Sequence, residues 1–191
     1  MAIKLRCETD PRWTQVVLDD FDAFLVDHAA AERKASATAM QFVAHYPDRQ
    51  ELVVACTHLA IEELVHFRQV VKILHNRGLI LQADRKDSYV AALHKRVRRG
   101  TEFYFLDRLL LAAVVEARGH ERFSLLASAL VDDDLSQFYR EISQSEFRHQ
   151  DLFVEMARRY FAETVVARHL EFWLDQEAEI ISAQLITAAL H

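Results

Sequence analysis

Residues that could bind metal recur at matched spacing in the two halves of this 191-residue chain. Each half carries one glutamate, and 30 or 31 residues later a glutamate followed by a histidine three positions on. The six residues are Glu32, Glu63, His66, Glu116, Glu146 and His149. On an α-helix, residues three apart share a face, so each Glu-x-x-His pair could bind one ion. The repeat predicts two helical hairpins with equivalent ligand sets.

Charge and residue type together indicate which metal such a site would take. Four carboxylates buried together repel one another and lose their hydration, and two divalent cations would compensate for both effects. Mixed carboxylate and imidazole ligands favour iron or manganese over magnesium or calcium. One glutamate from each of two helices, with Glu-x-x-His from each of two others, is the arrangement of di-iron carboxylate bundles. We therefore predict a di-iron centre at these six residues.

Three further polar residues lie close to the predicted ligands along the chain. His28 and His120 are one helical turn from Glu32 and Glu116, and Glu62 directly precedes Glu63. His28 and His120 could be additional ligands. We expect all three to act instead as hydrogen-bond partners of the ligands or as ordinary buried or surface residues, because metal-bound groups are commonly oriented by such neighbours.

The elements that must position these residues are long helices. The chain has only three glycines and two prolines, and apolar residues recur every three or four positions. Breakers such as Pro47, Gly78 and Gly100 separate the segments. The predicted helices cover residues 13–46, 49–77, 88–99, 102–131, 135–161 and 164–190. The predicted fold is all-α: a ferritin-like four-helix bundle with additional helices, formed by residues 1–191 as a single domain.

Composition limits the cellular setting. Two cysteines provide neither a disulfide framework nor a thiolate metal site, which is typical of a reducing cytoplasmic environment. No apolar stretch resembles a signal peptide or a membrane span, so we expect a cytoplasmic protein without a membrane partner. The net charge of −6 gives no general attraction to nucleic acid.

One stretch is nevertheless basic. It contains Lys95, Arg96, Arg98 and Arg99. In an acidic chain, such a concentration indicates either an anionic partner or a solvated helix face.

Longer strings around the predicted ligands resemble one enzyme family. DHAAAERKAS surrounds Glu32, LAIEELVHFRQV surrounds Glu63 and His66, VVEARGHERFSLLA surrounds Glu116, and SQSEFRHQDLF surrounds Glu146 and His149. Together they resemble the tRNA 2-methylthio-isopentenyl-adenosine hydroxylases, which belong to the ferritin-like superfamily. The resemblance extends from about residue 13 to residue 180 and departs from the family at Gly119-His120, where we associate the family with small or thiol residues.

The resemblance implies a di-iron monooxygenase that uses dioxygen. Its substrate would be an isopentenylated adenosine beside the anticodon of tRNA, and its product would carry a hydroxyl on the isopentenyl group. The implied partners are tRNA and an electron donor of unknown identity, with the basic stretch contacting phosphates. Two alternatives stay open: a ferroxidase or rubrerythrin-like peroxidase, and a non-catalytic helical RNA-binding scaffold.

Overall fold

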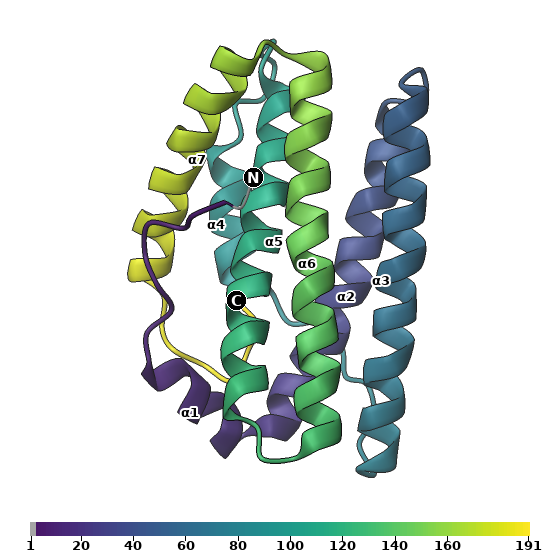
Figure 1. Ribbon diagram of the computed structural model, residues 1–191, viewed down its shortest axis with the longest axis vertical. Helices are drawn as coiled ribbons and strands as arrows, with labels where there is room; N and C mark the ends of the chain where they lie inside the picture. The colour runs from purple at the N-terminus through teal and green to yellow at the C-terminus, as the bar shows by residue number, and fades with distance from the viewer. Residues whose placement is uncertain (1–2) are drawn as a thin grey trace. The chain divides into compact units, whose positions relative to one another are not determined.

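The computed structural model describes residues 3–191, and that part of the chain contains seven α-helices and no strand (Figure 1). The all-α prediction is confirmed. The helices are α1 (Arg12–Asp19), α2 (Phe21–His45), α3 (Gln50–Asn76), α4 (Ser88–Arg96), α5 (Tyr104–Ala129), α6 (Asp133–Tyr160) and α7 (Glu163–Ser182). None of these helices is long and apolar enough to cross a membrane.

The described residues fall into two compact units, one comprising residues 15–85 with 187–190, and the other comprising residues 3–14, 86–186 and 191. The first unit is built on the hairpin of α2 and α3, which lie side by side in Figure 1. Leu25, Phe42, Leu52 and Leu74 are fully or almost fully buried, and burying such side chains stabilises the hairpin. The Ser36 hydroxyl donates to the Ala60 carbonyl oxygen at 2.8 Å and joins the two helices midway.

The second unit is built on the hairpin of α5 and α6, and α7 also packs against both of these helices. α5 is apolar on most of its circumference, with a continuous buried run from Phe105 to Val114, as expected for a helix surrounded by others. α6 begins at Asp133, and the side chain of Asp132 caps it by accepting a hydrogen bond from the Leu135 amide at 2.9 Å. The helix therefore starts two residues before residue 135, where the sequence placed its beginning.

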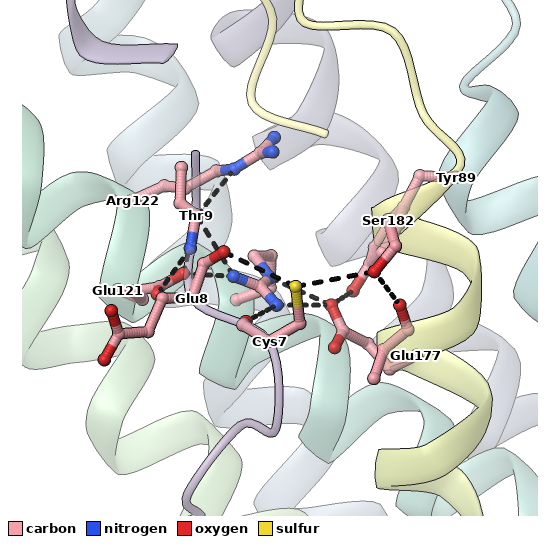
Figure 2. A network of polar contacts seen from close by, with 10 residues as sticks. Cys7, Glu8, Thr9, Tyr89, Glu121, Arg122, Glu177 and Ser182 are labelled. Atoms are coloured by element: carbon pink, nitrogen blue, oxygen red, sulfur yellow. Dashed lines mark hydrogen bonds and ion pairs between the residues drawn. The ribbon is translucent and has the colours of Figure 1, made fainter. Parts of the chain in front are cut away.

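Within the second unit, a buried polar network joins the N-terminal residues 7–9 to α5 (Figure 2). The Arg118 guanidinium is fully buried and contacts Glu177 of α7 at 2.8 Å. It also donates to the Thr9 hydroxyl at 3.0 Å and to the Cys7 carbonyl oxygen at 2.7 Å. Tyr89 of α4 donates to Glu177 at 3.0 Å. One side chain of α5 thus joins a helix and a non-helical segment that are distant from it in sequence.

Most predicted helix ends differ from the observed ones by one to three residues, and two predicted helices differ more. The segment 13–46 is not continuous, because the helix breaks at Asp20, whose side chain caps α2 by accepting from the Ala23 amide at 3.2 Å. The last helix ends at Ser182 rather than near residue 190. The following residues leave the helix, and the Leu190 amide donates to Asp27 at 2.8 Å.

Candidate metal centre

The first predicted ligand set is brought together within the α2–α3 hairpin. Glu32 is 3% exposed, Glu63 is 1% exposed and His66 is 8% exposed. His66 Nδ1 lies 3.2 Å from Glu63 Oε2 and 3.6 Å from Glu32 Oε2. One ligand atom from each of the three residues lies within 4.8 Å of the others. Two carboxylates and one imidazole therefore converge on one point.

His28 supports this cluster from one turn away on α2. The side chain is fully buried, and its Nε2 lies 2.6 Å from Glu32 Oε1. Glu32 thus has one oxygen toward His28 and the other toward His66. Such a contact fixes the orientation of a carboxylate that binds metal. Glu62, the other neighbour on this hairpin, is half-buried on α3.

The electrostatics of the cluster favour a cation. Burial by itself lowers the pKa of His66, but hydrogen bonds and charge interactions with Glu32 and Glu63 outweigh it and raise the pKa from 6.5 to about 10. Two buried carboxylates therefore hold a proton on a group that would normally lose it near neutral pH. A divalent ion would supply the same compensation more completely.

The second ligand set is brought together within the α5–α6 hairpin. His149 Nδ1 lies 3.7 Å from Glu146 Oε2 and 3.9 Å from Glu116 Oε2. The side chains of Glu146 and His149 are 7% and 3% exposed, and that of Glu116 is 11% exposed. This cluster has the same three donors as the first, with slightly longer separations.

Gly119 and His120 are neighbours on α5 but face different residues of α6. Gly119 faces Glu146, because a Cβ built on it would meet Glu146 Cγ and Oε2 at 3.7 Å, an ordinary van der Waals distance. His120 instead faces Ser143 of α6, whose carbonyl oxygen lies 2.8 Å from its Nδ1 and whose hydroxyl lies 2.9 Å from it. His120 is therefore held by Ser143, whereas His28 contacts a predicted ligand directly.

The donor sets fit the implied metals. Each cluster offers two carboxylates and one imidazole, a set that suits iron or manganese. The buried clusters of Glu and His indicate a di-metal site.

The basic stretch divides into two kinds of residue. Arg96 pairs with Glu179 at 3.0 Å, and Arg98 forms a bidentate pair with the buried Asp107. Lys95 and Arg99 are exposed. Burial, followed by the charges of Arg108 and Arg99, lowers the pKa of the neighbouring His94. The spacing of charges along the sequence does not distinguish these two kinds of residue.

One polar residue beside the second cluster was missed from the sequence. Gln150 follows His149 directly and is 1% exposed. The available signal was its position four residues after Glu146, on the same helix face as that ligand.

Comparison with solved structures identifies the fold class. A solved structure described as "Protein 43 with aldehyde deformylating oxygenase activity from Synechococcus" matches with a TM-score of 0.93 and 31% sequence identity. The match covers 99% of this chain and 96% of that one. It confirms the ferritin-like fold class predicted from the sequence.

Comparison of sequences identifies the family. A tRNA 2-(methylsulfanyl)-N(6)-isopentenyladenosine(37) hydroxylase of Pseudomonas putida is 34% identical over 179 residues, covering 94% of this chain and 87% of the relative. The protein of the same name from Salmonella typhimurium is 32% identical over 155 residues, and the match covers 81% of this chain but 56% of that protein. A family model described as tRNA-(MS[2]IO[6]A)-hydroxylase (MiaE) matches residues 2–191. The resemblance seen in the ligand strings is confirmed, and the chain belongs to the MiaE family of tRNA hydroxylases.

Proposed function

We propose that this enzyme hydroxylates the isopentenyl group of a modified adenosine next to the anticodon of tRNA. The observation that carries the proposal is that a chain of the MiaE family contains two buried clusters, each with two glutamates and one histidine. The relatives from Pseudomonas putida and Salmonella typhimurium are named as hydroxylases of this nucleoside at position 37.

We further propose that the two units form a single ferritin-like domain whose six ligands hold two iron ions. Glu32, Glu63 and His66 would supply ligands from one hairpin, and Glu116, Glu146 and His149 would supply ligands from the other, as in other di-iron bundles. When bound, the two ions would supply the reduction and cleavage of dioxygen, with electrons from a donor of unknown identity.

The protein's own residues would prepare this chemistry. His66 would lose its proton on binding metal, because an imidazolium has no lone pair to offer. His28 would hold Glu32 in its ligating orientation. Apolar side chains on the ligand-bearing faces, including Leu59, Ile142 and Phe153, would keep water out and accept a prenyl group.

The tRNA would approach the basic stretch, mainly through Lys95 and Arg99. These side chains are exposed, whereas Arg96 and Arg98 already pair with carboxylates of the same chain. We therefore expect Arg96 and Arg98 to contribute less than the sequence suggests. A base in the single-stranded anticodon loop can be splayed out of the stack and read by the protein.

The decisive experiment combines the iron-loaded, reduced protein with dioxygen and tRNA that carries the isopentenyl modification. Digestion and mass analysis should show nucleosides that have gained one oxygen on the isopentenyl group. Unmodified tRNA and oxygen-free reactions are the controls. Rapid peroxide consumption or iron oxidation without this product would indicate a peroxidase or ferroxidase. RNA binding without bound metal would indicate a scaffold.

A further inference from the structure

Gln150 is a buried side chain whose hydrogen-bonding groups are not used by the described part of the chain. The residue is 1% exposed, and neither its Oε1 nor its Nε2 has a hydrogen-bond partner among residues 3–191. Buried amides are nearly always hydrogen-bonded, because losing water without replacement costs free energy. An orphaned carboxamide in a core therefore points to a partner other than the chain.

The position of Gln150 on α6 indicates where that partner binds. Helical side chains lean toward the N-terminus of their helix, so the carboxamide is directed toward the turn that contains Glu146. Phe153 and Val154, on the other side, are buried hydrocarbons and offer no hydrogen bond. By this general rule and its spacing of four residues, the carboxamide belongs to the same face of α6 as Glu146.

We propose that Gln150 is a positioning residue that hydrogen-bonds a small oxygen or nitrogen ligand, such as water or azide, bound at the metal centre. This inference rests on the proposed di-iron function. A carboxamide suits the task because it offers both donor and acceptor groups and does not titrate near neutral pH. It would orient the bound ligand without adding another negative charge beside Glu116 and Glu146.

The test uses Gln150→Met, which keeps an unbranched side chain of similar length and removes both polar groups. The control is Gln144→Met, at an exposed position on the same helix. Azide affinity of the iron-loaded proteins would be measured by absorption titration, and thermal stability of the metal-free proteins by circular dichroism. For Gln150→Met we expect unchanged iron content and an azide affinity lower by about tenfold, which corresponds to the loss of one hydrogen bond. The metal-free variant should be at least as stable as the metal-free unsubstituted protein.

The outcomes separate this inference from the proposed function. If Gln150→Met binds azide as tightly as the unsubstituted protein, or if the metal-free variant is markedly destabilised, Gln150 has only a structural role. Gln150→Leu repeats the stability comparison with a second apolar shape, and loss of folding in both variants would likewise show a structural role. If the unsubstituted protein forms hydroxylated tRNA while Gln150→Met keeps full azide affinity, only the inference fails. If the unsubstituted protein binds no iron, both fail.

Discussion

Replacing Arg118 by methionine should destabilise the protein more than any surface substitution. Arg118 and Glu177 are both fully buried, and Arg118 Nη2 lies 2.8 Å from Glu177 Oε1. Burial lowers the pKa of Arg118, but Glu177 and Glu121 outweigh it, so the guanidinium stays charged. Without Arg118, the Glu177 carboxylate would stay buried with only the Tyr89 hydroxyl as a hydrogen-bond partner among residues 3–191.

The magnitude follows from the burial of both partners. Removing one member of a buried ion pair typically costs about 3–5 kcal/mol, because the other charge loses its compensation. The lost hydrogen bonds to Thr9 and to the Cys7 carbonyl belong to the same network and are not added separately. For a chain of this size, about 1 kcal/mol shifts Tm by roughly 2–4 °C, so the Tm should fall by about 6–20 °C.

Urea and thermal denaturation of the metal-free proteins, followed by circular dichroism, would measure the effect. Arg68→Met, at an exposed position of α3, is the control and should change stability by less than about 0.5 kcal/mol. Replacing Glu177 by leucine in the Arg118→Met background removes the orphaned charge and should restore part of the loss. A loss below about 1 kcal/mol for Arg118→Met alone, or no recovery in the double variant, would refute the reasoning.

Three further predictions concern the metal ligands and the tRNA. Because the pKa of His66 is raised from 6.5 to about 10 in the folded protein, its protonation stabilises the metal-free fold fully below pH 6.5, and that stabilisation is lost as the pH rises toward 10. Urea denaturation at successive pH values should therefore show falling stability over this window, and the fall attributable to this residue should be absent in His66→Ala. Replacing Glu146 by alanine should lower the iron content per chain, as measured by elemental analysis. Glu155→Ala, at an exposed position of the same helix, should leave the iron content unchanged. Equal iron content in both variants would contradict the ligand assignment. Replacing Lys95 and Arg99 by glutamine should weaken tRNA binding. In a filter-binding titration, the slope of log affinity against log salt concentration should become flatter by about 0.7–0.9 for each lost phosphate contact. An unchanged slope would mean that the tRNA binds elsewhere.

Local patterns made most of the helices predictable. Gly78 and Gly100 follow helices, as expected for breakers, and adopt positive φ, which glycine tolerates. The break at Asp20 was missed because the apolar periodicity continues across it, and a single side-chain cap competes with that pattern only locally. The end of α7 was also missed, because the conformation of the residues after it depends on tertiary contacts. One such contact is the hydrogen bond from the Leu190 amide to Asp27.

The sequence by itself predicted two sets of candidate ligands and indicated the enzyme family, which the comparisons confirm. A spacing of three residues places Glu and His on one helix face, and the ligand strings carry the family resemblance. Only the tertiary structure decided which neighbours matter. His28 reaches Glu32 while His120 turns to Ser143, although both lie one turn from a predicted ligand. Likewise, Arg98 is paired with the buried Asp107 while Arg99 is exposed. These outcomes depend on which side chains meet between packed helices, which the spacing along one helix does not specify.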